Sequence, residues 1–161
     1  MVTVEAATPS DTDAVADLWV DLVSEQRRYG SKLLADPNRD AIRKSMAHHA
    51  VKDGLAVARD GDDIVGFARY GVEEGPLAVT VTRGVVRDLY VVAAHRRSGV
   101  GSALLDAAET ALRDRGVDVI RLEALAANDD AVRLYENRGY RPHRIGFEKE
   151  VETDKNARAE R

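Results

Sequence analysis

The chain has 161 residues, of which 44% are hydrophobic and none is cysteine, and its formal net charge at pH 7 is -4. That length can supply the core of one domain, and the lack of cysteine excludes disulfides, thiolate metal sites and a cysteine nucleophile. The negative charge argues against a general nucleic-acid binder. Because no run of about eighteen apolar residues occurs and the N-terminus does not resemble a signal peptide, we expect a cytoplasmic protein without a membrane partner.

The first half of the chain predicts a strand, two helices and a strand hairpin. Capping residues and a proline precede an amphipathic pattern with helical spacing. Further along, Asp60-Gly61-Asp62-Asp63 favours a tight turn between two short strands, since Asp-Gly suits a positive φ. The helices are expected over Thr12–Gln26 and Arg39–Val51, and the strands over Val2–Ala6, Leu55–Arg59 and Ile64–Tyr70.

The second half predicts an alternation of strands and helices. A third strand is expected to start near Leu77 and to continue, with a break at Arg83-Gly84, to Val92. A helix over Gly99–Arg115, a strand over Val119–Ala124, a helix that opens near Asn128 and a final hairpin follow. We expect residues 1–151 to form one domain and the charged residues 152–161 to be a disordered tail.

The most informative motif is the basic turn HRRSGVG, residues 95–101, between the third strand and its helix. A helix N-terminus has unpartnered N–H groups and the positive end of the helix dipole, so glycines there let an anion approach the backbone. Arg96 and Arg97 add positive charge. Two glycines alone are as typical of a tight structural turn as of an anion-binding site.

Two common nucleotide motifs are excluded at this turn. A dinucleotide-binding fingerprint needs a third glycine where Leu104 stands. A P-loop needs Gly-Lys-Ser/Thr after a gap of four residues, and no such sequence occurs.

Two spaced motifs together carry a family resemblance. Residues 96–101 read Arg-Arg-Ser-Gly-Val-Gly and fit [R/Q]-x-x-G-x-[G/A], while residues 128–140 fit N-x-x-A-x-x-x-Y-x-x-x-G-[FY] at every fixed position. In both motifs the chain resembles the GNAT superfamily of N-acetyltransferases, over about residues 85–147. The resemblance implies an α/β fold with a mixed, mostly antiparallel twisted sheet, flanking helices and a β-α-β-α core that binds acetyl-CoA.

The resemblance also implies an activity. An acyltransferase of this kind moves the acetyl group of acetyl-CoA to a primary amine by direct attack in a ternary complex, without a metal. The amine is a small amine, an amino acid, a protein N-terminus or a lysine. Members of the family commonly form homodimers, which stays open for this chain.

Site residues follow from the same resemblance. The loop binds the pyrophosphate of acetyl-CoA, the strand at residues 89–91 pairs with the pantetheine arm, and the backbone N–H of Val91 is the oxyanion donor. Tyr135 is the general acid that protonates the departing thiolate. Asn128 and Ser102 contact the cofactor or cap their helices. The cofactor-binding candidates are Leu89, Tyr90, Val91, Arg96, Arg97, Ser98, Gly99, Val100, Gly101, Ser102, Asn128 and Tyr135.

The general base and the acceptor are less defined. In polyamine-type relatives the strand reads Glu-Asp-Leu-Tyr-Val or close to it, but here Arg87 stands at the first acidic position, whereas Asp88 keeps the second. Alternation places Asp88 on the opposite strand face from Leu89. The acceptor pocket is expected at Trp19, Tyr29 and Asp88. Substitute bases are Glu73, Glu74, Glu123, His48, His49 and His143.

Two other functions stay open. One is a non-catalytic regulator that binds an acyl-CoA but lacks a working base. The other is a nucleotide-binding module that uses the same loop. Thiol release stimulated by an amine would distinguish the enzyme from the regulator, and preference for ATP or NAD over coenzyme A would identify the nucleotide module.

Overall fold

The computed structural model describes residues 1–152, and the chain divides into two compact units at Asn128. The second unit begins with helix α4 (Asp129–Asn137). The first unit contains three α-helices and one five-stranded sheet. Its helices are α1 (Thr12–Gln26), α2 (Arg39–Val51) and α3 (Val100–Asp114), and its strands are β1 (Val2–Ala6), β2 (Leu55–Asp60), β3 (Asp63–Val72), β4 (Arg83–Val91) and β5 (Val119–Leu122).

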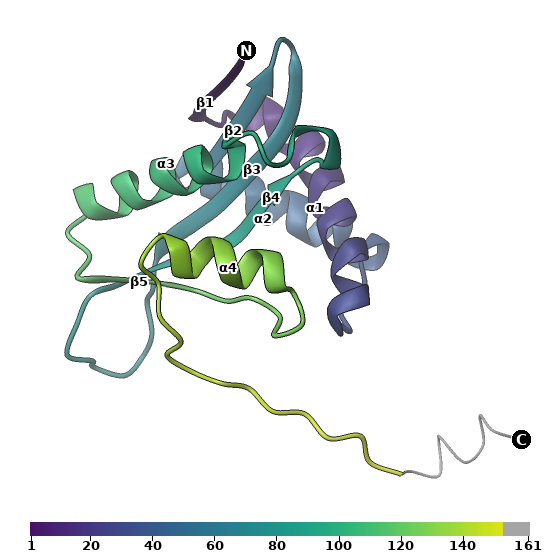
Figure 1. The fold of residues 1–161 in the computed structure, drawn as a ribbon. Helices are drawn as coiled ribbons and strands as arrows, with labels where there is room; N and C mark the ends of the chain where they lie inside the picture. Colours follow the sequence, from purple (N-terminus) through teal and green to yellow (C-terminus); the bar gives the residue numbers. More distant parts are fainter. Residues whose placement is uncertain (153–161) are drawn as a thin grey trace, which may run out of the picture. The chain divides into compact units, whose positions relative to one another are not determined.

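The sheet is mixed and mostly antiparallel, as the sequence predicts. Its strands lie in the order β1-β2-β3-β4-β5, with antiparallel pairing up to β4 and parallel pairing between β4 and β5 (Figure 1). A parallel pair needs a long crossover connection, and α3 supplies it. With α4 after β5, the expected β-α-β-α order is confirmed.

Helices cover both faces of this sheet in the first unit (Figure 1). On β3, Phe67 is fully buried in a cluster that includes Trp19 of α1 and Met46 of α2. Its neighbour Gly66 faces the other way, because side chains alternate along a strand. There, an added Cβ would lie 3.1 Å from a methyl group of Leu104 in α3. The sheet is therefore enclosed by α1 and α2 on one face and by α3 on the other.

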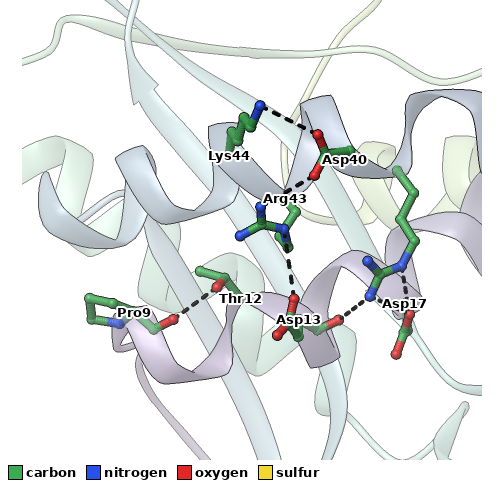
Figure 2. Close-up of polar contacts among 8 residues, drawn as sticks. Pro9, Thr12, Asp13, Asp17, Asp40, Arg43 and Lys44 are labelled. Carbon is green, nitrogen blue, oxygen red and sulfur yellow. Dashed lines mark hydrogen bonds and ion pairs between the residues drawn. The ribbon is translucent and has the colours of Figure 1, made fainter.

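Ion pairs link α1 to α2 on the exposed side of the two helices (Figure 2). Arg39 donates from Nε to Asp17 Oδ1 at 2.9 Å, and Arg43 lies 3.8 Å from Asp13. Pairs this exposed contribute roughly 0.2–1 kcal/mol each. The buried apolar stripe of α1 thus contributes more to the packing than these charges do.

The strand predicted from Leu77 is wrong in its first part. β4 begins at Arg83, and residues 77–82 form bends and coil. The β3–β4 ladder closes where Glu73 donates its N–H to Arg83 O at 2.8 Å, so the residues between them have no neighbouring strand. Leu77 and Val79 are exposed. Alternation alone cannot create a strand when its N–H and C=O groups have no partner.

The predicted final hairpin is also absent from the described residues. Gly139 ends α4 with a φ of 91°, as expected for a left-handed C-cap, but residues 140–152 form no strand. Ile145 and Phe147 in this segment are exposed. Of the predicted tail, residues 153–161 lie outside the described part of the chain, and the domain boundary at residue 151 stays a prediction.

Within residues 1–152, no helix has the length and apolar content that a membrane span requires.

Candidate functional site

The turn between β4 and α3 contains two residues with a left-handed backbone. A short 3-10 helix (Ala93–His95) follows β4, and then Arg97 and Gly99 adopt positive φ angles of 62° and 85°. Left-handed residues in a turn aim successive N–H groups into one concavity, which binds anions. A Cβ on Gly99 would meet nothing within 4 Å, so its φ and not crowding favours glycine.

The N-terminus of α3 adds further donors to this turn. The first helical bond runs from Ala103 N to Gly99 O at 3.0 Å, and no side-chain hydrogen bond caps this helix end within the described residues. The N–H groups of Val100, Gly101 and Ser102 precede that first bond, so they have no helical partner. Together with the positive end of the helix dipole, they form a site suited to a phosphate group.

The last residues of β4 have an open edge on the side of β5. The β4–β5 ladder ends at the pair Val86 and Leu122, whereas β4 continues to Val91. Val92 N donates to Val65 O of β3 at 2.9 Å. In an antiparallel ladder, alternate residues point toward and away from the partner strand. The N–H and C=O groups of Leu89 and Val91 therefore point away from β3, toward the open edge.

An extended ligand could pair with this edge. Backbone N–H and C=O groups need a partner or water, and the open edge presents groups from Leu89 and Val91 at the spacing of a strand. The turn before α3, with its unpartnered N–H groups, follows directly along the chain. A ligand with an anionic end and an extended amide arm has the chemistry that fits both features.

The Arg96 side chain is already engaged within the protein. Its Nε donates to Val91 O at 2.8 Å, and its NH2 group donates to both carboxylate oxygens of Glu25 in α1, at 3.0 and 2.8 Å. Its guanidinium lies 5.5 Å from the centre of the Tyr90 ring. In contrast, Arg97 is exposed and makes no hydrogen bond or ion pair within the described residues.

Tyr90 completes this group of side chains. Its hydroxyl donates to Glu25 Oε1 at 3.2 Å. Burial, together with the negative charge of Glu25, raises the pKa of Tyr90 to about 12. The phenol therefore remains a neutral donor to Glu25 at physiological pH. Neither Glu25 nor its partnership with Arg96 follows from the sequence, because the two residues are 71 positions apart.

The remaining cofactor candidates have defined local positions. Ser98 Oγ donates to His95 O at 2.7 Å, and Ser102 is half-buried in the first turn of α3. Asn128 immediately precedes α4, and its N–H donates to Leu125 O at 2.9 Å. Tyr135 lies in the second unit, where its ring makes an edge contact with Tyr140 at 6.1 Å between centroids.

The three acceptor-pocket candidates have different immediate surroundings. Trp19 is buried in the core cluster of the first unit. Tyr29 lies in a short 3-10 helix (Arg27–Tyr29), with the Arg28 guanidinium 4.8 Å from its ring centre. Asp88 is paired with Arg69. Large aromatic residues on the apolar stripe of a helix commonly pack into the core. Trp19 has this structural role.

Among the proposed substitute bases, Glu73 and His49 have defined partners. Glu73, the residue after β3, accepts from Arg83 of β4 at 3.1 Å and from Arg121 of β5 at 2.9 Å. His49 Nδ1 donates to Ser45 O at 2.8 Å. Glu74, Glu123, His48 and His143 are exposed.

Replacing Asp88 by alanine should destabilise the protein by about 3 kcal/mol. Arg69 Nε donates to Asp88 Oδ2 at 2.6 Å and NH1 donates to Ser45 Oγ at 3.1 Å, and the two charged side chains are only 14% and 12% exposed. Loss of the carboxylate leaves a nearly buried cation. Urea unfolding measures the effect. Asp17→Ala, which breaks the exposed pair with Arg39, should cost less than about 1 kcal/mol; equal costs would contradict the prediction.

His49 should make stability depend on pH. Burial lowers the pKa of His49, and the positive charges of Arg69, Arg87 and His48 lower it further. In this pH range the unfolded chain binds more protons, so the stabilisation is fully present above about pH 6.5 and is lost progressively as the pH falls from there through the lower pKa of the folded protein. The free energy of unfolding, measured with urea at pH 7.5 and 5.5, should fall less in His49→Gln than in wild type. His48→Gln should retain most of the wild-type decrease, because the charge of His48 is the smallest of the contributions that shift the pKa of His49.

Comparisons with known proteins include a match to a family model. The model described as the acetyltransferase (GNAT) family matches residues 19–140. The uncharacterised protein YxbD of Bacillus subtilis (strain 168) is 32% identical over 108 residues, which cover 67% of this chain and 62% of that protein. The chain therefore spans about three fifths of the length of this curated relative.

Solved structures share the fold. A GCN5-related N-acetyltransferase from Ralstonia eutropha JMP134 has a TM-score of 0.74 at 22% identity, over 94% of this chain and 99% of that chain. AAC(6')-Iy, solved in complex with the bisubstrate analogue CoA-S-monomethyl-acetylneamine, has a TM-score of 0.68 at 13% identity, with the same coverage of 94% and 99%. At these identities the likeness extends to the fold alone.

Proposed function

Because the chain belongs to the acetyltransferase (GNAT) family, we propose that it transfers the acetyl group of acetyl-CoA to a primary amine by direct attack in a ternary complex. The observation that carries this proposal is the continuity of two features in the first unit. The open edge of β4 at Leu89 and Val91 leads directly into the phosphate-binding turn at the start of α3. The bisubstrate analogue bound to AAC(6')-Iy supports a coenzyme A ligand for this fold.

Each part of the donor substrate has a matching part of the chain in this proposal. The N–H groups from Ser98 to Ser102 bind the pyrophosphate, and the exposed side chain of Arg97 adds charge to them. The open backbone groups of Leu89 pair with the amides of the pantetheine arm, because the Val91 carbonyl already accepts from Arg96 and the Val91 N–H is the donor to the thioester oxygen. This arrangement brings the thioester to the end of β4.

The reaction then needs one oxyanion donor and one acid. The amine nitrogen attacks the thioester carbonyl carbon, and the N–H of Val91 stabilises the oxyanion that forms. When the C–N bond is complete, the C–S bond breaks and the thiolate takes a proton from the hydroxyl of Tyr135. The proton lost by the amine nitrogen passes to water, and Tyr135 takes a proton back from water, which restores the starting state of the enzyme. No covalent acyl-enzyme is required, consistent with a chain that has no cysteine.

Binding and turnover test this proposal in two steps. Calorimetry should detect binding of acetyl-CoA and coenzyme A but not of ATP or NAD. Thiol release should then be measured with a panel of polyamines, amino acids, lysine and peptides with free N-termini. Release that depends on one class of amine would support the enzyme and identify its acceptor class, whereas no binding of coenzyme A would overturn the proposal.

A regulator remains the second candidate because of two observations on β4. Arg87 stands at the position that is acidic in polyamine-type relatives, and the carboxylate of Asp88 is held by Arg69. With Arg87 at the first position and Asp88 paired at the second, neither residue provides a free carboxylate to act as the general base. Tight binding of acetyl-CoA without thiol release from any amine in the panel would favour this regulator over the enzyme.

A further inference from the structure

Arg96 connects three parts of the first unit that the proposed reaction uses or borders. Its backbone lies in the phosphate-binding turn, its Nε binds the carbonyl of Val91 at the end of β4, and its NH2 group binds Glu25 near the C-terminal end of α1. These bonds use the planar fork of the guanidinium, and the contact with Glu25 involves both carboxylate oxygens. Both oxygens of Glu25 accept from the same NH2 nitrogen, while Nε donates to Val91 O, so the planar guanidinium links Glu25 to the backbone of Val91 in a fixed geometry.

The peptide bond that contains the Val91 N–H lies between the Tyr90 side chain and the Val91 carbonyl, and both of these are held by the Arg96–Glu25 pair. On one side, the hydroxyl of Tyr90 donates to Glu25 and its ring lies under the guanidinium. On the other side, the carbonyl of Val91 accepts from Arg96. The orientation of the Val91 N–H is thus constrained from both ends by the same ion pair.

We propose that Arg96 is a positioning residue, which with Glu25 fixes the backbone at Val91, and that its side chain is not a ligand of the pyrophosphate. This inference rests on the proposed acetyl transfer and assigns a different task to each of the two neighbouring arginines. Arg97 adds charge at the phosphate site. Arg96 instead aligns the oxyanion donor and ties it to α1.

The ion pair is better suited to alignment than to stability. The side chains of Arg96 and Glu25 are 37% and 35% exposed, and pairs with this exposure contribute little to the free energy of unfolding. Alignment is different, because a displacement of about 1 Å at a reacting group can reduce the rate about 100-fold. Loss of the pair should therefore reduce turnover in a protein that remains folded.

The kinetic test uses two acetyl donors, acetyl-CoA and S-acetylpantetheine, which lacks the pyrophosphate. We expect Arg96→Ala and Glu25→Gln each to reduce kcat about tenfold to 100-fold with either donor, with little change in the KM for acetyl-CoA. The double variant should be no slower than the slower single variant, because the two residues act as one unit. Arg97→Ala is the comparison, and it should raise the KM for acetyl-CoA but not for S-acetylpantetheine.

Other kinetic results would overturn the proposal. If the Arg96→Ala defect occurred only with acetyl-CoA and only in KM, Arg96 would be a pyrophosphate ligand. If Glu25→Gln behaved as wild type, the ion pair would have no role in positioning. Thermal unfolding of each variant checks that a loss of rate does not come from loss of the fold.

A second readout is independent of activity. The carbon resonance of the Val91 carbonyl, measured by NMR in the ligand-free protein, should shift in both Arg96→Ala and Glu25→Gln and not in Arg97→Ala. Unchanged resonances in the first two variants would overturn the proposal. If no amine released thiol from the wild-type protein, the proposed function would fail, whereas this resonance would still decide whether Arg96 positions Val91.

Discussion

Gly101→Glu is expected to abolish binding of acetyl-CoA while the first unit remains folded. Gly101 is the second residue of α3, two positions after the left-handed Gly99, and its N–H is among those without a helical partner. A glutamate there adds bulk and negative charge where the pyrophosphate would bind. The same charge is favourable for the helix itself, because a carboxylate near a helix N-terminus interacts well with the dipole. We expect an affinity loss of at least about 100-fold, or about 2.7 kcal/mol, by calorimetry.

Thr110→Glu is the matched control for this experiment. Thr110 is exposed on the same helix, nine residues further on, which is about 13 Å along the axis. The added charge is equal, but it lies away from the turn, so acetyl-CoA affinity should remain close to that of wild type. Retained affinity in Gly101→Glu would mean that the turn is not the phosphate site. An equal loss in both variants would point to a general effect of charge on α3.

Local sequence patterns predicted most of the fold. The bounds of α1 and α2 follow from capping residues and helical spacing, and the turn between β2 and β3 follows from Asp60-Gly61. These signals depend on residues a few positions apart, which the sequence displays directly. The turn between β4 and α3 belongs to the same class, since glycines and a following amphipathic helix predict it.

Features that depend on distant partners were not predictable in this way. Residues 77–82 alternate like a strand, yet the β3–β4 ladder does not include them. The sequence of the segment itself does not indicate where this pairing ends. The same limit applies to Arg96. Its motif position favours a phosphate ligand, whereas its actual partner, Glu25, comes from a helix far away in the sequence.

Asp88 shows how far alternation alone can reach. The sequence places it on the strand face opposite Leu89, which is the face where Tyr90 meets the core cluster under α1 and α2. This much follows from a period of two. That Asp88 is neutralised by Arg69, directly across the ladder on β3, depends on the register between strands. Register is fixed by the whole hairpin and not by the strand sequence.

Tyr135→Phe should reduce kcat about 100-fold or more while leaving the affinity for acetyl-CoA nearly unchanged. The substitution removes only the hydroxyl, and phenylalanine retains the ring that contacts Tyr140 in the second unit. Steady-state thiol release and calorimetry measure the two quantities. Tyr140→Phe is the matched control, because it alters the other ring of the pair and should keep turnover near the wild-type value. Unchanged turnover in Tyr135→Phe would remove Tyr135 from the acid role.

The leaving group offers a direct check on that role. A general acid matters most when the departing thiolate is strongly basic, since a weakly basic thiolate leaves without a proton. The defect of Tyr135→Phe should therefore become smaller with an acetyl thioester of a more acidic thiol than coenzyme A. A defect of the same size with both thioesters would place the contribution of the hydroxyl in another step, because protonation of the thiolate could not then be the step that the variant slows.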